Sequence, residues 1–134
     1  MTGKDILMYN GNLNALANKK LPAKLALIIS ANAMELGKWA TQIDTQRMKI
    51  AERYAEKDKD GKAITEEKDG KKCYRLTNEG ADEFTAEYLE FLDEEIEGVE
   101  ILKYKQEDLG KQLEDPRYDV LTLAEVGMLM FMLD

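Results

Sequence analysis

Apolar residues between positions 22 and 57 recur at steps of three and four, which is the spacing of one helix face. This pattern predicts a long helix over 22–57 whose seam is a heptad repeat with two polar members, Asn32 and Gln46. The members of the seam are Leu25, Ile29, Asn32, Leu36, Trp39, Ile43, Gln46 and Ile50. Leu27, Ile28 and Met34 lie off the seam and predict a second buried face in the N-terminal half.

The length of this helix predicts a homo-oligomer. At 1.5 Å per residue it spans roughly 50 Å, which is too long for a small monomer to cover. We therefore expect part of the seam to pack against another chain, and the residues assigned to that interface are Leu25, Ile29, Leu36, Trp39 and Ile43. The alternative is that two later helices of the same chain, over 78–97 and 122–133, cover the whole seam.

Shorter elements follow the long helix. Two Asp-Gly pairs, ending at Gly61 and Gly70, are tight-turn signals and predict a β-hairpin over 62–76. An acidic helix over 78–97 with an apolar stripe comes next, and Thr77 or Asn78 can cap it. The apolar and polar residues of 99–104 alternate as in a strand.

The two ends of the chain complete the predicted architecture. Thr122 and Glu125 form a capping-box pattern for a C-terminal helix over 122–133, which is apolar nearly all round and therefore buried or in an interface. Residues 1–21 predict a strand or short helix broken near Gly11, and we expect 5–9 to pair with 99–104 in a small sheet. The fold class is mainly α (α+β), in a single domain over 1–134.

Composition excludes several kinds of chemistry. The chain has no histidine, which removes the commonest general base and the Ser-His and Cys-His nucleophile systems. Its single cysteine, Cys73, excludes an internal disulfide and a cysteine-rich metal site. No apolar run approaches the roughly 20 residues that span a bilayer, and the N-terminus lacks a secretory signal. We expect a soluble protein that is not an enzyme, with no cofactor, no metal and no membrane contact.

The net charge of −8 is unevenly spread. Nine acidic residues and no basic residue lie between Asp82 and Glu100. An acidic chain repels phosphate backbones, so general nucleic-acid binding is disfavoured. The favoured interpretation of this stretch is a solvated helix face, on which Glu90 and Glu94 are neighbours. A surface that imitates a phosphate track is an alternative, and catalysis by paired carboxylates is a weaker one.

A calcium loop is the sharpest motif candidate. Counted from Glu56, acidic residues fall at positions one, three and five, Gly61 falls at position six and Glu67 at position twelve, close to the EF-hand pattern. However, position one is Glu, position eight is Ala63, lysines crowd the loop and no helix start follows Glu67. We therefore favour an ordinary hairpin turn.

Two groups of basic residues are candidates for an anion or nucleotide site. One group surrounds the start of the long helix, where free N–H groups attract anions. The second group lies near the end of that helix, where a tyrosine can stack on a base. The ligand-binding candidates are Lys19, Lys20, Lys24, Arg47, Arg53 and Tyr54. The competing interpretation, ordinary surface cations with intrahelical pairs such as Lys49 with Glu52, is favoured.

Several short stretches also occur in a fixed order along the chain. They are Asn10-Gly11, Leu21-Pro22-Ala23-Lys24-Leu25, Tyr54-Ala55-Glu56-Lys57-Asp58 with Gly61, Glu83-Phe84 with Glu87-Tyr88, Val99-Glu100-Ile101 and Leu121-Thr122-Leu123-Ala124-Glu125. In this order the chain resembles a family of small proteins of unknown function that tailed phages and prophages encode. The resemblance covers most of the chain, although the part over 68–72 is longer and more basic than the family pattern.

The resemblance implies a phage accessory protein that acts in the cytoplasm of the infected bacterial host. It implies no catalytic residues. Together with the composition, it leads us to expect a non-enzymatic counter-defence factor that sequesters a host signalling nucleotide or a host defence protein. The alternative is an accessory protein of virion or tail assembly.

Overall fold

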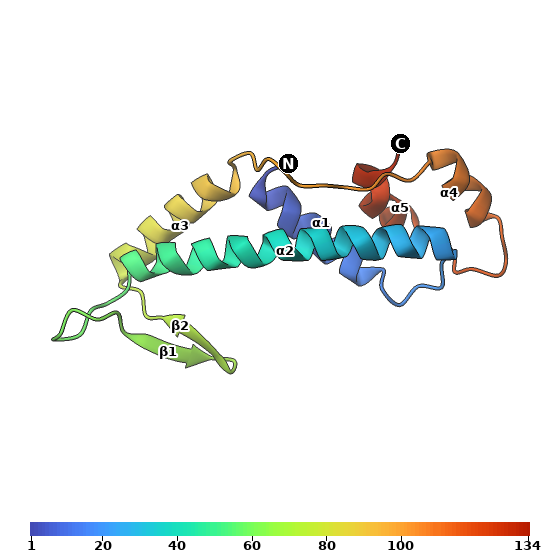
Figure 1. Cartoon of the computed structure of the whole chain (residues 1–134). Helices are drawn as coiled ribbons and strands as arrows, with labels where there is room; N and C mark the ends of the chain where they lie inside the picture. Colours follow the sequence, from blue (N-terminus) through green and yellow to red (C-terminus); the bar gives the residue numbers. More distant parts are fainter.

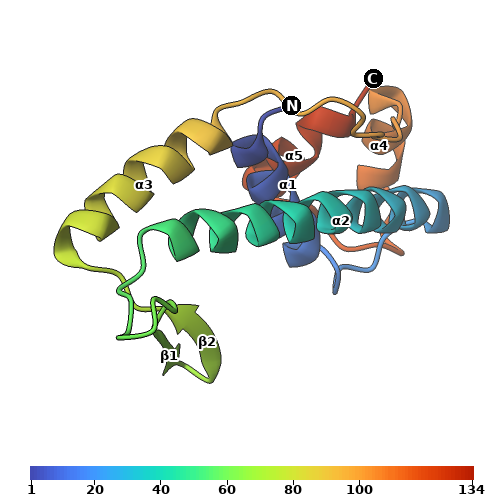
Figure 2. The same ribbon diagram turned by 60° about the vertical axis from the view of Figure 1, so that its left-hand side comes forward.

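The computed structural model describes all 134 residues, arranged as helices along one long axis with a projecting hairpin (Figure 1). The long helix α2 forms the axis; α1 and the C-terminal helices lie beside its first half, and α3 follows its second half (Figures 1 and 2). The elements are α1 (Gly3–Ala15), α2 (Ala23–Arg53), β1 (Thr65–Lys68), β2 (Lys71–Tyr74), α3 (Asn78–Leu92), α4 (Gln106–Leu113), α5 (Leu123–Leu129) and the 3-10 helix η1 (Met130–Met132). The expected fold class, mainly α (α+β), is confirmed.

The first helix, α1, is continuous. Thr2 Oγ1 accepts a hydrogen bond from Asp5 N at 3.1 Å, and the Asp5 carboxylate accepts one from Thr2 N at 3.0 Å, which is a capping box. Ile6 and Leu13, two turns apart, are buried in the core. Burial of this stripe outweighs the roughly 1 kcal/mol cost of Gly11 inside a helix. The predicted break near Gly11 is therefore wrong.

The seam of α2 is buried, but its own chain covers it. Leu25, Ile29, Leu36 and Ile43 belong to one hydrophobic core, and Trp39 is half-buried against it. The other buried members of that core are Ile6, Leu13, Leu16, Leu92, Tyr104, Leu109, Leu121, Leu129 and Met132. The physical basis for placing an oligomer interface on these seam residues is thus removed, because intramolecular packing occupies them.

The off-seam residues of α2 also differ from expectation. Leu27 and Met34 are 71% and 78% exposed, so the predicted second buried face is wrong at these positions. The helix ends at Arg53 and not at residue 57, because the chain beyond it pairs with the hairpin. Ala55 bridges to Leu76, and the Glu56 N–H donates to the Arg75 carbonyl at 2.7 Å.

The hairpin predicted over 62–76 is confirmed. Its antiparallel strands β1 and β2 are in the register that places Thr65 opposite Tyr74 and Lys68 opposite Lys71. Asp69 and Gly70 form the two-residue turn with φ of +54° and +77°, the left-handed pair of a type I′ turn. The hairpin projects away from the helices, on the side of α2 opposite to α3 (Figures 1 and 2).

The acidic helix, α3, is shorter than predicted. Thr77 caps it, since Thr77 Oγ1 accepts a hydrogen bond from Gly80 N at 2.8 Å. The helix ends at Leu92 and not at residue 97, because the following backbone is engaged elsewhere: the Ile96 N–H donates to the Met1 carbonyl at 2.9 Å.

The segment over 99–104 is extended but belongs to no sheet. The side chain of Asn32, fully buried on α2, donates to the Leu102 carbonyl at 2.9 Å and accepts from the Leu102 N–H at 2.8 Å. One turn further along α2, Glu35 Oε2 accepts from the Glu100 N–H at 2.9 Å. The predicted strand and its sheet with residues 5–9 are therefore wrong: side chains of a helix satisfy this backbone.

The C-terminal region closes the core. The capping box predicted at Thr122 and Glu125 is present, with hydrogen bonds of 3.0 and 3.1 Å. The helix predicted over 122–133 is divided, because α5 gives way to η1 at Met130. The ring of Phe131 stacks on Tyr9 of α1 with centroids 4.1 Å apart, so this end of the chain packs on the first helix.

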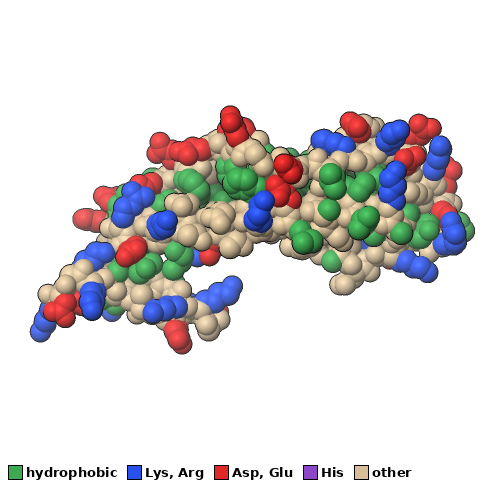
Figure 3. Space-filling model, viewed as in Figure 1, with side chains coloured by type: hydrophobic (Ala, Val, Ile, Leu, Met, Phe, Trp, Pro, Cys, Tyr) green, Lys and Arg blue, Asp and Glu red, His purple; other side chains and the backbone are tan.

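Charge is segregated along the molecule. Residues 78–100, called here the acidic arm, contain ten acidic residues and no basic residue, whereas the remaining chain contains nineteen basic and seventeen acidic residues. The whole net negative charge therefore lies on the arm. In Figure 3, acidic side chains gather over α3 and basic side chains gather over the hairpin.

Replacing Asn32 with leucine is expected to destabilise the fold. The change keeps the volume but removes both partners of the part-buried Leu102 N–H and C=O, at a total cost of about 1–3 kcal/mol. Urea unfolding measures the loss. Ser30→Ala, an exposed change on the same helix, should stay within about 0.5 kcal/mol of wild type. Equal stability of Asn32→Leu and wild type would contradict the role given to this amide.

Glu35 is expected to make stability depend on pH. The hydrogen bond from Glu100 N–H, with those from Lys38 and Trp39, lowers the pKa of Glu35 from 4.5 to about 2. Because the folded-state pKa is depressed, the stabilisation is complete above about pH 4.5 and is lost as pH falls toward 2. The difference in unfolding free energy between wild type and Glu35→Gln should therefore shrink between pH 6 and pH 3. A constant difference would contradict this assignment, and Glu114→Gln, an exposed change, serves as control.

Candidate functional site

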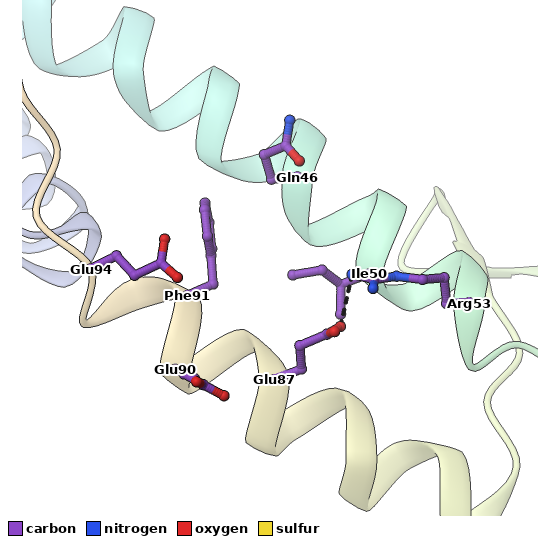
Figure 4. A pocket seen from close by; sticks show the side chains of 7 residues that line it. All are labelled: Gln46, Ile50, Arg53, Glu87, Glu90, Phe91 and Glu94. Carbon is purple, nitrogen blue, oxygen red and sulfur yellow. Dashed lines mark ion pairs between the residues drawn. The ribbon is translucent and has the colours of Figure 1, made fainter.

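A concave site lies between α2 and α3. It is a cavity of about 320 Å³ lined by Gln46, Ile50, Arg53, Glu87, Glu90, Phe91 and Glu94. Figure 4 shows Ile50 reaching from α2 toward α3, and Phe91 and Glu87 reaching from α3 toward α2. We call this site the α2–α3 groove. Its volume is at the lower end of the range for small-molecule pockets, and it suits a single side chain of a partner.

The closest approaches of α3 to its neighbours lie at its two ends, and the groove lies between them. At its start, Gly80 approaches α2 so closely that an added Cβ would lie 2.6 Å from the Tyr54 carbonyl oxygen. At its end, Leu92 is buried against Gly3 of α1. Between these two contacts, Glu87 and Phe91 extend from α3 toward α2 across the groove (Figure 4).

The lining combines two apolar side chains with three acidic ones. Ile50 and Phe91 are the apolar members, and three carboxylates, those of Glu87, Glu90 and Glu94, lie around them. Such a lining accommodates an aliphatic chain that ends in a cation, because the stem stays on apolar surface while the charge meets carboxylates.

One cation already lies at the groove. Arg53 Nη2 lies 2.9 Å from Glu87 Oε2 and forms an ion pair with it. The N–H groups of Arg53 do not point at this oxygen, so the pair is not a hydrogen bond. The Arg53 side chain is 60% exposed and that of Glu87 is 32% exposed, so the pair is worth at most about 1 kcal/mol. A stronger cationic ligand can therefore replace Arg53 as the partner of Glu87.

Aromatic residues adjoin the groove on α3. The rings of Phe84 and Tyr88 stack with centroids 5.6 Å apart. Burial raises the pKa of Tyr88, an effect that nearby Arg47 opposes. The phenol is therefore neutral at physiological pH and contributes no further negative charge to this side of the arm.

The predicted anion-binding residues at the start of α2 do not converge on a site. Lys19 Nζ pairs with Glu125 Oε2 at 3.1 Å. The backbone N–H of Lys20 donates to the Asp119 carboxylate at 2.6 Å, while Lys24 is exposed and makes no ion pair. These lysines are distributed over the surface around the α1–α2 connection.

The second predicted group is likewise dispersed. Arg47 pairs with Asp44 at 2.9 Å on the exposed side of α2, Arg53 lies at the acidic groove, and Tyr54 packs on Gly80. Lys24 and Arg53 are separated by 29 residues of α2, which corresponds to about 44 Å. The structure thus brings the two basic groups to opposite ends of one helix.

Sequence reasoning identified the α3 face but not its counterpart on α2. The sequence pattern predicts that Glu90 and Glu94 share one face and that Gln46 is a polar member of an apolar seam. That polar position was the available signal, because Gln46 is an exposed member of the seam between the buried Ile43 and Ile50.

A second hollow, of about 240 Å³, lies between α4 and α5 and is mostly apolar. Its lining residues are Gln106, Leu109, Gly110, Leu113, Val126, Met130 and Leu133. Nearby, the Tyr104 hydroxyl and the Gln112 carbonyl oxygen are buried without hydrogen-bond partners. No charged side chain lines this hollow, so it offers little to fix the orientation of a ligand.

The carboxylates of the candidate calcium loop are used in other ways. Asp58 Oδ1 accepts hydrogen bonds from the N–H groups of Asp60 and Lys62 and closes its own turn. Glu56 pairs with Arg75 at 3.3 Å, and Glu67 lies in β1. The structure contains no group of three or more metal-ligating side chains placed to hold an ion, and none of its helices has the length and apolarity to cross a bilayer.

Comparisons of the chain with protein-family models, with curated proteins and with solved structures found no match.

The close approach of Gly80 to α2 gives a test of how the groove is held open. Gly80→Ala should destabilise the protein by about 1–3 kcal/mol, because its Cβ would meet the Tyr54 carbonyl. Gly11→Ala is the matched control: it is also helical, has no atom within 4 Å of the added Cβ, and should stabilise by about 0.5–1 kcal/mol. Thermal or urea unfolding measures both. Stabilisation by both changes would contradict the contact at Gly80.

Proposed function

We propose that this chain is a non-enzymatic binding protein that captures a cationic segment of a protein partner in the α2–α3 groove. The observation that supports this most is the lining of the groove, in which Ile50 and Phe91 supply apolar surface and three glutamates supply negative charge. A lysine or arginine side chain matches both parts, since its stem is apolar and its end is charged. The segregation of charge supports the same ligand, because the acidic arm attracts cations over a distance.

The charge of the groove favours a protein partner over a signalling nucleotide. Three carboxylates and one arginine line the groove, and the net negative field repels phosphate. The other candidate cations either pair with acids, as Lys19 and Arg47 do, or lie at the far end of α2, as Lys24 does. Of the two expected modes of counter-defence, we therefore propose the sequestration of a host defence protein.

The biological setting of this proposal follows from the resemblance to proteins of tailed phages. A counter-defence factor would bind a bacterial protein in the infected cell, whereas an assembly factor would bind a phage structural protein. Both use the groove in the same way, so the origin of the partner distinguishes them. A pull-down from infected cells with wild type and a groove variant as bait separates the two roles.

Binding of a cationic probe to the groove can be measured by calorimetry with a hexalysine peptide. We expect Glu90→Gln/Glu94→Gln to weaken binding at least about tenfold, because it removes two of the three carboxylates of the groove. The matched control, Asp82→Asn/Glu83→Gln, removes the same charge from α3 at exposed positions outside the groove and should change binding much less.

Two outcomes would contradict the proposal. Equal weakening by both variants would show that hexalysine responds only to the net charge of the arm. Binding of a cyclic oligonucleotide that Arg53→Ala abolishes, with no binding of hexalysine, would restore the nucleotide as the ligand.

A further inference from the structure

We infer that the α2–α3 groove also binds the hairpin tip of a second copy of this chain, so that two chains form a symmetric dimer. The hairpin tip is defined here as residues 68–72, with the sequence Lys-Asp-Gly-Lys-Lys. This inference rests on the proposed function because it fills the same groove with the same chemistry. The ligand differs: here it is a segment of a second copy of the chain and not a segment of another protein.

The hairpin tip carries repulsion that is not relieved within the chain. Lys68 and Lys71 are directly opposite each other in the strand register, and like charges in that position destabilise a sheet. Lys68 has only a long contact of 3.7 Å with Glu66, while Lys71 and Lys72 make no ion pair. A carboxylate ligand placed at the tip would remove this repulsion.

The acidic arm carries repulsion between negative charges. Glu90 lies in the last turn of α3, Glu94 lies two residues past its end, and both carboxylates line the groove, where like charges repel each other. They lie near the C-terminal end of α3, where the helix dipole favours cations, and the last turn contains no basic residue. The hairpin tip would supply the cations that α3 lacks.

A chain cannot place its own hairpin tip in its own groove in this structure. The hairpin and α3 lie on opposite sides of the end of α2, and both views show this arrangement (Figures 1 and 2). In Figure 3, basic side chains over the hairpin and acidic side chains over α3 face different directions. The complementary surfaces can therefore meet only between two chains.

A twofold dimer would satisfy both contacts at once. The groove is lined by the last part of α2, from Gln46 to Arg53, and the hairpin region begins directly after that helix. Hairpin and groove therefore lie at the same end of the molecule. An axis near that end would place each hairpin tip in the groove of the other copy, which is the self-complementary arrangement that closes a pair.

The contact would compete with capture of another protein. A lysine of the hairpin tip would lay its stem over Phe91 and Ile50 and place its ammonium among Glu87, Glu90 and Glu94. A cationic segment of a partner would have to displace it. Dimerisation would then set the concentration above which the groove is closed.

Reversing the charges of the hairpin tip and of the groove tests this inference. Light scattering measures the molar mass of each variant from about 10 to 300 µM protein. Wild type should show the mass of two chains at the upper concentrations and less dimer when salt rises from about 50 to 500 mM, because screening weakens the contact. Lys68→Glu/Lys71→Glu and Glu90→Lys/Glu94→Lys should each remain monomeric alone. An equimolar mixture of these two variants should dimerise again, and so should the fourfold variant, because both contacts regain opposite charges.

The control variant Lys59→Glu/Lys62→Glu changes two exposed lysines outside the hairpin tip and should dimerise like wild type. Circular dichroism checks that each variant folds; if a reversal variant does not, Glu90→Gln/Glu94→Gln replaces it and should also be monomeric. A wild type that stays monomeric to about 300 µM, or a dimer that the reversals leave intact, would overturn the inference. If hexalysine still binds the groove of such a monomer, the proposed function stands without it.

Discussion

The structure depends on the side-chain amide of Asn32. This buried group exchanges two hydrogen bonds with the backbone of Leu102, as a neighbouring strand would, although it belongs to a helix. Glu35 repeats the arrangement one turn later at Glu100. Together they hold an extended segment along α2 and thereby bring the C-terminal helices back onto the core. A buried polar group is costly unless satisfied, so the two bonds select this path of the chain over others.

The same path explains why the molecule has a packed body and an open arm. The N-terminal half of α2 is enclosed by α1 and by the C-terminal elements that the Asn32 contact returns to it. Nothing comparable returns to the C-terminal half, where α3 makes its closest approaches to its neighbours near Gly80 and Leu92. The α2–α3 groove is the part of the long helix that the chain is too short to cover.

Local rules of helix and hairpin stability are broken at two places of opposite charge. The end of α3 accumulates acids where its dipole favours bases, and the hairpin tip sets Lys68 against Lys71. Other helix starts follow these rules, with capping boxes at Thr2 and Thr122. Violations of local consistency are most frequent at functional sites, so they mark the two surfaces on which our proposals rest.

The sequence by itself determined the features that depend on neighbouring residues. The periodicity of 22–57 predicted α2 and its buried seam, the Asp-Gly pair at 69–70 predicted the hairpin, and Thr122 with Glu125 predicted a helix start. Tertiary structure decided the rest. It carried α1 through Gly11, because burial outweighs a local propensity, and it kept 99–104 out of a sheet, because its partners lie about seventy residues away on α2. The partner of the α2 seam and the existence of the groove were decided in the same way, because periodicity shows that a face is buried but not what covers it.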